Sequence, residues 1–426
     1  MSRCKALHRM NIMLHTSAAM TDIKAVTAFF MTFSFLAATS PCPVDNSTRC
    51  SCAYGDIICK ETDIFPQFQR DSETIYRSVD LSKTNLRDIP EAPFYHIKVR
   101  KIVLDFNPIG DSIHLNAFAG VEEVLEILSM GACELSAVRK FLLYELKRLK
   151  VLHLWGNKIK DLPSGMFQQT QNLEELYLWG NRIEQLDEQM FKGLNRLRRL
   201  DLDRNNIREI RNNTFRFLEN LEVLHLGENN IYTIYGNTFR YLTNLKVLNL
   251  DRNGLRYIYG TAFNGLSQLL ALGLQNNEIN FIVDGTFQDL KNLNILWLQN
   301  NRIDLIWSKT FTGLTCIQKL YLSGNKIKNL PPMLFHESTK LKQLILDNNA
   351  LTSLQKCIFS RRTRLKTLSM VGNPLYCDCS LSWLLDLSRK GVTIWGTCGA
   401  HNNKSLVAVA SPSSYQCSFS SADCYV

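Results

Sequence analysis

The chain has 426 residues, of which 45% are hydrophobic and 21% are charged. These proportions are ordinary for a folded protein, so they argue against wholesale disorder and against a multi-pass membrane protein. The formal net charge of +10 would suit nucleic acid, anionic glycans or acidic proteins, but a solvated basic surface on a chain of this length gives the same excess.

Residues 1–40 contain a mostly apolar stretch from Ala25 to Ala38. This stretch is typical of the hydrophobic core of a signal peptide, with Lys24 as its positive flank and Met20 as a possible start. A signal anchor is the alternative, but the stretch is shorter than the ~20 residues that a membrane-spanning helix needs. We therefore expect cleavage after this stretch, and no membrane span in the mature, secreted chain.

The thirteen cysteines gather near the two ends of the chain and are sparse between them. Disulfide bonds that staple two ends would be arranged in this way, and they form in an oxidising compartment. The first group lies within residues 41–72 and follows the pattern Cys-Pro-x6-Cys-x-Cys-x6-Cys. Its members are Cys42, Cys50, Cys52 and Cys59.

The middle of the chain, residues 73–372, repeats itself every 24 residues. An asparagine marks each unit, at positions 157, 181, 205, 229, 253, 277, 301, 325, 349 and 373. The units follow the pattern Leu-x-x-Leu-x-Leu-x-x-Asn-x-Leu, and a phenylalanine recurs ten residues after each asparagine. Cys133, Asn107 and Thr84 extend the series upstream at less regular intervals, which gives about twelve units.

This pattern resembles that of the leucine-rich-repeat family, and the recurring phenylalanine resembles its typical extracellular subclass. The resemblance implies an α/β repeat solenoid in the shape of a horseshoe, with irregular or 3-10 segments on the convex face. The residues themselves point the same way. The Leu-x-Leu step has the two-residue period of a strand, and a single unit cannot bury its apolar residues alone. Stacked units would therefore pair their strands into a parallel sheet on the concave face.

The repeat also predicts what the marker residues do. The asparagine amide can donate to and accept from backbone groups where the chain leaves the strand, so we expect a structural role. Cys133 takes this place in one early unit, where we expect a buried thiol. Thr84 takes it in the first unit.

A solenoid needs terminal caps because its apolar column would otherwise be open at both ends. The first cysteine group resembles the N-terminal flanking cap of extracellular leucine-rich-repeat proteins, and residues 373–426 resemble the C-terminal flanking cap. This second resemblance implies a pairing of Cys377 with Cys398 and of Cys379 with Cys417, and a short helix that carries Trp383 over the last repeat. Four cysteines could instead bind zinc, but the leader favours disulfides. We expect no metal and no cofactor.

Three more cysteines have no predicted state. Cys316 and Cys357 lie in different units and at different phases, so a bond between them is not expected. Cys424 lies beyond the usual four-cysteine cap, and it could close an extra loop, pair with another chain or stay free.

The outward positions of the strands identify a candidate binding surface, because the repeat itself does not require large side chains there. Tyr177, Trp155 and Trp179 form the first predicted contact patch, since aromatic side chains dominate binding energy in protein interfaces. Stacking that only stabilises the sheet is the alternative. The full set of predicted ligand-binding residues is His153, Trp155, Tyr177, Trp179, Asp201, Asp203, His225, Trp297 and Tyr321, and Asp251 and Gln299 occupy equivalent positions.

Other surfaces carry weaker signals. Arg198, Arg199 and Arg204 adjoin the predicted acidic positions and would tune specificity. A basic cluster that could bind sulfated glycans, or that is only a solvated turn, consists of Arg361, Arg362, Arg364 and Lys366. Acceptor tripeptides for N-glycosylation begin at Asn46, Asn212 and Asn403.

Motifs of hydrolases, phosphate-binding loops and zinc-binding helices do not occur, so we expect no enzyme and no nucleic-acid binding. The resemblance covers the whole chain and extends to Slit, Nogo-receptor-like, chondroadherin-like and variable lymphocyte receptor ectodomains. It implies a secreted scaffold in the extracellular space or matrix that binds a protein ligand or receptor through its concave face. The alternatives are a fragment of a membrane-bound receptor and a structural matrix component that binds collagen or sulfated glycans.

Overall fold

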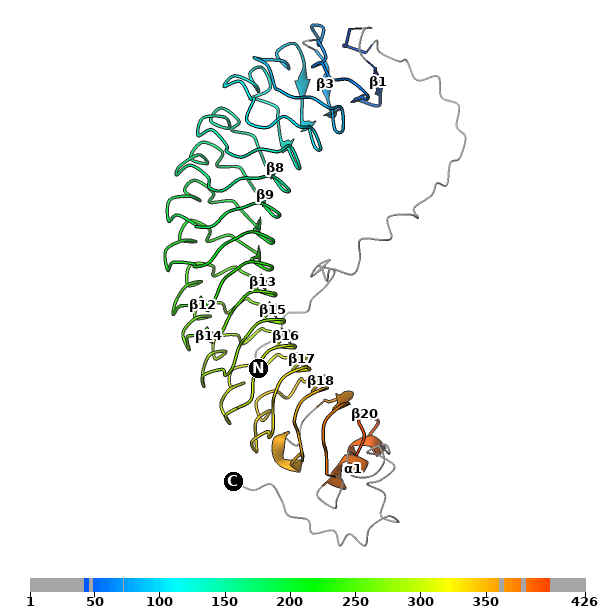
Figure 1. The fold of residues 1–426 in the computed structure, drawn as a ribbon, viewed down its shortest axis with the longest axis vertical. Helices are drawn as coiled ribbons and strands as arrows, with labels where there is room; N and C mark the ends of the chain where they lie inside the picture. The colour runs from blue at the N-terminus through cyan, green and yellow to red at the C-terminus, as the bar shows by residue number, and fades with distance from the viewer. Residues whose placement is uncertain (1–41, 46–48, 72, 360–363, 377–380, 399–426) are drawn as a thin grey trace, which may run out of the picture.

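The structure is a computed structural model that describes residues 42–45, 49–71, 73–359, 364–376 and 381–398. These residues form a curved stack of coils, with the strands along the inner edge of the curve (Figure 1). The predicted leader, residues 1–40, lies outside the described residues. No helix in the described ranges has the length and apolar character that a membrane crossing requires.

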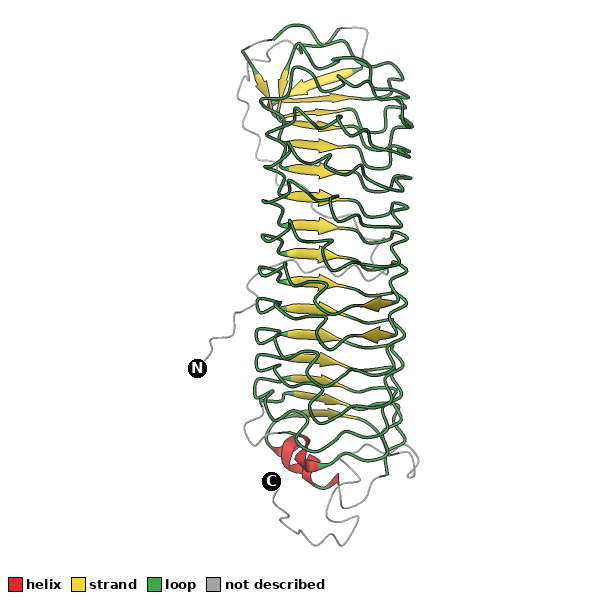
Figure 2. Ribbon diagram, turned by 90° about the vertical axis from the view of Figure 1, so that its left-hand side faces the viewer, coloured by secondary structure: helices red, strands yellow, loops and turns green. Residues whose placement is uncertain are grey.

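A single 16-stranded sheet runs the length of the stack, with its strands in order along the chain (Figure 2). All neighbouring strands are parallel except β1 and β2, which form an antiparallel hairpin. The strands are β1 (Cys50–Ala53), β2 (Asp56–Cys59), β4 (Ser78–Asp80), β6 (Lys101–Val103), β7 (Ile127–Ser129), β8 (Val151–His153), β9 (Glu175–Tyr177), β10 (Arg199–Asp201), β11 (Val223–His225), β13 (Val247–Asn249), β15 (Ala271–Gly273), β16 (Ile295–Trp297), β17 (Lys319–Tyr321), β18 (Gln343–Ile345), β19 (Thr367–Ser369) and β20 (Thr393–Trp395).

The strand register follows the repeat. Leu176, Leu200 and Leu224 are direct partners across β9, β10 and β11, and each is fully buried. The residues on either side of each leucine point to the opposite face of the sheet, as strand geometry requires. The predicted parallel sheet on the concave face is therefore confirmed.

A column of phenylalanines fills the interior behind the sheet. Phe215 stacks on Phe191 with ring centroids 6.2 Å apart and on Phe239 at 6.0 Å. Similar contacts link the phenylalanines of successive coils as far as Phe359. Because these rings meet only across coil boundaries, no coil could bury its phenylalanine without its neighbours.

The repeated asparagines form a second column, and each one joins two coils. The Nδ2 group of Asn181 donates to the carbonyl oxygen of Leu178 in its own coil and to that of Leu154 in the coil before, both at 2.9 Å. Its Oδ1 accepts from the backbone N–H of Ile159 at 3.1 Å. These groups lie where the chain leaves the strand and cannot pair with a neighbouring strand, so the predicted structural role is confirmed.

The two irregular units use the same position with other side chains. Cys133 is a buried free thiol, and its Sγ lies 3.1 Å from the carbonyl oxygen of Leu104, to which it donates. In the first unit, the hydroxyl of Thr84 donates to the carbonyl oxygen of Leu81 at 2.7 Å. Both side chains thus satisfy a carbonyl group that asparagine satisfies elsewhere.

The convex side is mostly turns and bends, as expected. Its regular pieces within the described residues are the strand pair β12 (Thr233–Ile234) and β14 (Tyr257–Ile258) and one 3-10 helix, Lys356–Ile358. A further short pair, β3 (Ile75–Tyr76) and β5 (Lys98–Val99), lies one residue before β4 and β6 along the chain.

The N-terminal cap is disulfide-bonded as expected. Cys42 is bonded to Cys52 and Cys50 to Cys59, and the hairpin that they brace pairs with the first repeat through β4. This hairpin covers the open end of the sheet.

At the other end, the helix α1 (Trp383–Arg389) covers the last coil. The indole of Trp383 packs edge-on against Phe359 and donates from Nε1 to the carbonyl oxygen of Leu354 at 3.2 Å. Cys398 is buried and disulfide-bonded, and Cys316 and Cys357 are disulfide-bonded as well. The remaining cysteines of the predicted cap, Cys377, Cys379 and Cys417, lie outside the described residues, as does Cys424.

Candidate functional site

Two columns of residues on the concave face point away from the leucine core. The first column follows the central leucine of each strand, and the second lies two residues further on. Strand pairing places His153 beside Tyr177, Tyr177 beside Asp201, and Asp201 beside His225. The predicted binding residues therefore form one continuous surface, and they divide into two aromatic clusters with a polar region between them.

The N-terminal aromatic cluster comprises Phe106, His153, Trp155, Tyr177 and Trp179. Trp155 and Trp179 stack with centroids 5.2 Å apart and planes 4° from parallel, and His153 stacks on Tyr177 at 4.5 Å. Phe106 meets Trp155 edge-on at 5.3 Å. The two tryptophans, His153 and Tyr177 are half-buried, so each ring remains partly accessible.

Gly131 explains how the first tryptophan reaches its neighbours. A Cβ atom on this residue would lie 2.2 Å from Trp155 Cε2, because the indole crosses the strand position that Gly131 leaves empty. The indole thereby reaches Phe106, two coils upstream. Stacking and exposure thus occur together, and the sheet-stabilising and ligand-binding interpretations of these rings do not exclude one another.

Burial also sets the ionisation of this cluster. It lowers the pKa of His153, because the charged imidazolium would lose water, and thereby favours the neutral ring. Tyr177 lies under the guanidinium of Arg199, with Arg199 Cζ 5.4 Å from its ring centroid, and its hydroxyl donates to Glu175 Oε2 at 2.5 Å. Burial raises the Tyr177 pKa, and the Glu175 carboxylate raises it further.

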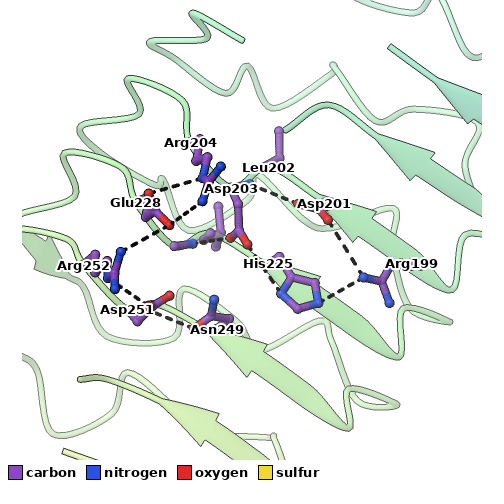
Figure 3. Close-up of polar contacts among 12 residues, drawn as sticks. Arg199, Asp201, Leu202, Asp203, Arg204, His225, Glu228, Asn249, Asp251 and Arg252 are labelled. Atoms are coloured by element: carbon purple, nitrogen blue, oxygen red, sulfur yellow. Dashed lines mark hydrogen bonds and ion pairs between the residues drawn. The ribbon is translucent and has the colours of Figure 1, made fainter. Parts of the chain in front are cut away.

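A central polar network follows on β10, β11 and β13 (Figure 3). His225 lies between two charged groups, with Nδ1 3.8 Å from Asp203 Oδ2 and Nε2 3.4 Å from an Arg199 Nη atom. Asp203 accepts a hydrogen bond of 2.6 Å from the backbone N–H of Gly227. The members of the network are Arg199, Asp201, Asp203, Arg204, His225, Glu228, Asn249, Asp251 and Arg252.

The outer edge of this network consists of ion pairs. Glu228 lies between two arginines, 3.2 Å from Arg204 Nε and 3.7 Å from an Arg252 Nη atom. Arg252 Nε is also 3.9 Å from Asp251 Oδ2. The arginines thus fix the acidic side chains in place at the edge of the face.

The acids of the network are held in an environment that disfavours their charge. Burial raises the pKa of Asp203 well above its usual value of 3.8, and the nearby carboxylate of Asp201 raises it further. Burial likewise raises the pKa of Asp251, against the opposing effect of a hydrogen bond with Asn249. Carboxylates in this condition are typical of functional sites, although structural networks produce them too.

The C-terminal aromatic cluster is the pair Trp297 and Tyr321. Their rings stack with centroids 6.2 Å apart and planes 7° from parallel, and the Tyr321 hydroxyl donates to Gln343 Oε1 at 3.1 Å. Both rings are half-buried, so the two ends of the central polar network are bounded by partly accessible aromatic rings.

Two predicted contact residues lie deeper than their strand phase implies. Asp201 is 6% exposed and His225 is 4% exposed, because the long side chain of Arg199 and the carboxylate of Asp203 lie against them. They support the surface from below, whereas Asp203 lies partly at the surface.

The other predicted surface positions lie away from these clusters. Asn212, Arg364 and Lys366 are exposed. Arg361, Arg362, Asn46 and Asn403 lie outside the described residues. Within the described ranges, no group of three or more His, Cys, Asp and Glu side chains is arranged to hold a metal ion.

Sequence reasoning missed several members of the surface. Asn249 has the same phase as His225 and could have been found from it. Phe106 lies in a unit with irregular spacing, so its approach to Trp155 was not visible in the repeat. Glu228 and Arg252 lie one residue beyond the second column and share the phase of Arg204, so the 24-residue period could have placed these three side by side.

A family model described as "Leucine rich repeat" matches residues 123 to 375 in overlapping segments, which is more than half of the chain. The chain belongs to the leucine-rich-repeat family. The matched segments are 123–183, 147–207, 171–231, 196–255, 219–279, 243–303, 267–327 and 317–375.

Solved structures share the fold of this leucine-rich-repeat protein. Toll of Drosophila, in its complex with Spatzle, matches with a TM-score of 0.62 and 20% identity over 78% of this chain and 54% of Toll. The leucine-rich-repeat part of FLRT2, in an octameric complex with latrophilin 3 and Unc5D, matches with a TM-score of 0.61 and 20% identity over 84% of this chain and 96% of that chain. This chain therefore spans about half the length of Toll. A search of curated protein sequences gives no match.

Proposed function

We propose that this leucine-rich-repeat protein is secreted and binds a protein partner through its concave face, as an extracellular recognition scaffold. The observation that carries the proposal is the N-terminal aromatic cluster. Trp155, Trp179 and Tyr177 are large, partly accessible rings at positions that the repeat could fill with any polar residue. Rings of this kind, held rigid by stacking, lose little conformational entropy when a partner covers them.

Two features support an extracellular location. The bonds Cys42–Cys52 and Cys50–Cys59 need an oxidising compartment to form and persist. The apolar stretch within residues 1–40 would direct the chain there. In that compartment the exposed Asn212 would be open to glycosylation.

The charge of the concave face favours a protein over a nucleic acid. Asp203 and Asp251 line the middle of the surface, with Asp201 buried beneath them, and in their ionised form they would repel a phosphate backbone. The structures of Toll with Spatzle and of FLRT2 with latrophilin 3 and Unc5D are complexes with other proteins. The likeness to them is one of fold, and it makes a protein ligand the first class to test.

The proposal also holds that the chain is a binder and no enzyme. The acidic groups of the central polar network are engaged with arginines, with His225 and with backbone N–H groups. Such groups fix one another and are poorly placed to move a proton onto a substrate.

The test begins with the full chain expressed in animal cells with a C-terminal tag. Tagged protein should appear in the medium with a glycan that peptide N-glycosidase removes. The purified protein is then screened against an array of displayed extracellular domains, and each binder is measured by surface plasmon resonance.

Two variants decide where a binder contacts the protein. The double variant Trp155→Ala/Trp179→Ala should weaken binding at least about tenfold, the effect expected of central aromatic contacts. The matched control is Trp307→Ala, which removes an exposed indole from beyond the sheet. Binding that the double variant leaves unchanged would overturn the concave-face proposal, and a chain retained inside the cell would overturn secretion.

A further inference from the structure

Two glycines interrupt the columns of side chains at the middle of the concave face. Gly227 lies in the coil of β11 and Gly273 ends β15, and polar side chains from Asp203, Asn249, Asp251 and Gln275 surround them. We name this surface the polar floor. It consists of Asp203, Gly227, Asn249, Asp251, Gly273 and Gln275.

The side chains around each glycine lie over it. A Cβ atom on Gly227 would lie 2.3 Å from Asp251 Oδ1, 2.8 Å from Asn249 Nδ2 and 3.2 Å from Asp203 Oδ1. A Cβ atom on Gly273 would lie 2.8 Å from Asn249 Oδ1 and 3.2 Å from Gln275 Oε1. The glycines therefore let oxygen atoms from three coils gather on one small area, and Asn249 connects its two halves.

One of these acceptors has no donor among the described residues. Gln275 is 6% exposed, and its Oε1 is buried without a hydrogen-bond partner. A buried acceptor that lacks a partner costs free energy, so its persistence points to a donor that arrives from outside. Because this oxygen lies beside the position of a Gly273 Cβ, an incoming donor would meet it over the polar floor.

The two carboxylates of the floor accept hydrogen bonds from Gly227 and Asn249, but the nearest basic atoms that face them lie further away. Asp203 Oδ2 and Asp251 Oδ2 have basic atoms at 3.8 and 3.9 Å, in His225 and Arg252, which is beyond hydrogen-bond distance. Burial and neighbouring carboxylates raise the pKa of Asp203, and burial raises that of Asp251. A cation placed between them would stabilise the ionised form of both.

We propose that the polar floor binds the protonated side chain of a lysine or an arginine of the protein partner. This inference rests on the proposed function and names the chemistry of its central contact. An ammonium or guanidinium group supplies both a positive charge at short range, which Asp203 and Asp251 lack, and a donor, which Gln275 Oε1 lacks. Asp203 adjoins the N-terminal aromatic cluster through β9 and β10, and Gly273 pairs with Trp297. Aromatic faces at both ends suit the apolar stem of such a side chain.

The experiment uses small probes, so that it does not depend on knowing the partner. The full folded chain is titrated with N-acetyl-lysine methylamide and N-acetyl-arginine methylamide, followed by tryptophan fluorescence and by NMR. The matched neutral probes are N-acetyl-norleucine methylamide and N-acetyl-citrulline methylamide. Saturable binding of one or both cationic probes, about tenfold or more tighter than its neutral counterpart, is expected, and the stronger of the two identifies lysine or arginine.

Variants locate the binding. Gly227→Ala keeps every charge but displaces Asp251 and Asn249. Asp251→Asn keeps the shape of the side chain but removes its charge. Each variant should weaken binding of the cationic probe at least about fivefold. Gly254→Ala is the control, because its Cβ would meet nothing nearer than the Ile231 carbonyl oxygen at 3.9 Å. Circular dichroism verifies that each variant is folded.

The pH dependence gives an independent readout. Cation binding should weaken as the pH falls through the raised pKa values of Asp203 and Asp251, because protonation removes the charge that attracts the probe. Equal affinity for neutral and cationic probes, no binding of either cation, or full binding by both Gly227→Ala and Asp251→Asn would overturn the inference. The test of the proposed function with Trp155 and Trp179 would stand separately, since it measures a whole partner.

Discussion

The side-chain amide nitrogen Nδ2 of Asn229 donates a hydrogen bond of 2.9 Å to the carbonyl oxygen of Leu202, which lies one coil earlier. The same amide donates to Leu226 in its own coil at 3.2 Å, and its Oδ1 accepts from the backbone N–H of Ile207 at 3.0 Å. One side chain thus satisfies buried backbone groups of two coils and holds the coils in register.

Replacing this amide should therefore destabilise the coil boundary. Asn229→Ala leaves the Ile207 N–H without its acceptor. The carbonyl oxygens of Leu202 and Leu226 each lose one donor and keep the one that Asn205 or Asn253 supplies. We expect a loss of about 1–3 kcal/mol in the free energy of unfolding. Hydrogen exchange gives the local measurement, because the amide of Ile207 should lose its protection. The control is Asn230→Ala, an exposed neighbour, which should change stability by no more than ~0.5 kcal/mol. Unchanged protection at Ile207 would contradict the structural role of the asparagine column.

The phenylalanine column should show how far a defect spreads. Phe215→Ala removes a fully buried ring from between Phe191 and Phe239 and should cost about 3–5 kcal/mol. Because each coil contacts only its neighbours, faster hydrogen exchange should appear near β10 and β11 and leave β18 unchanged.

A matched variant lies two residues away. Phe217 is partly exposed, with Arg216 Cζ 4.7 Å from its ring centroid, so Phe217→Ala removes the same group from a looser environment. It should cost clearly less than Phe215→Ala. Uniform acceleration of exchange along the chain would show a single cooperative core in place of a stack.

The periodic part of this fold could be predicted because each structural role recurs at a fixed spacing. A leucine that points inward once does so in every coil, and the same holds for the asparagine that bridges coils. The outward strand positions followed from the same phase, which is how Trp155 and Trp179 were placed together. The family match and the strand register confirm these predictions.

The rest depended on contacts that no repeat encodes. Asp201 and His225 are buried because the long Arg199 side chain extends over the sheet and contacts both of them. The reach of Trp155 to Phe106 needs the absence of a side chain at Gly131. Such effects arise where one coil differs from the next, and a pattern built on what coils share cannot contain them.

Cys133 should be chemically inert in the folded protein. Burial raises the pKa of its thiol to about 12, from an ordinary value of 9.0. At pH 8 this shift lowers the thiolate fraction about 1000-fold, and burial also blocks access. We expect iodoacetamide to leave Cys133 unmodified in the native chain and to alkylate it after denaturation. Peptide mass spectrometry assigns the modified cysteine, and rapid native alkylation at Cys133 would show that the coil opens there.

The raised pKa of Asp203 should make the free energy of unfolding depend on pH. Asp203 keeps its proton to a higher pH in the folded chain than in the unfolded chain, so the folded state binds more protons between 3.8 and the raised pKa. The contribution of Asp203 to the free energy of unfolding is therefore present at low pH and is lost as the pH rises through that window. Asp203→Asn removes the charge, and its Oδ1 can still accept from the N–H of Gly227.

We expect Asp203→Asn to be more stable than the unmodified protein at pH 7, by about 1–2 kcal/mol, and the difference to vanish below pH 4. Urea unfolding at a series of pH values measures this. Asp187→Asn should behave oppositely. Hydrogen bonds from the Gln189 N–H and the Ser164 hydroxyl lower the Asp187 pKa, so this variant should lose stability at pH 7. If both variants shift stability in the same direction at pH 7, burial does not destabilise the charge of Asp203, and the cation preference inferred for the polar floor loses its electrostatic support.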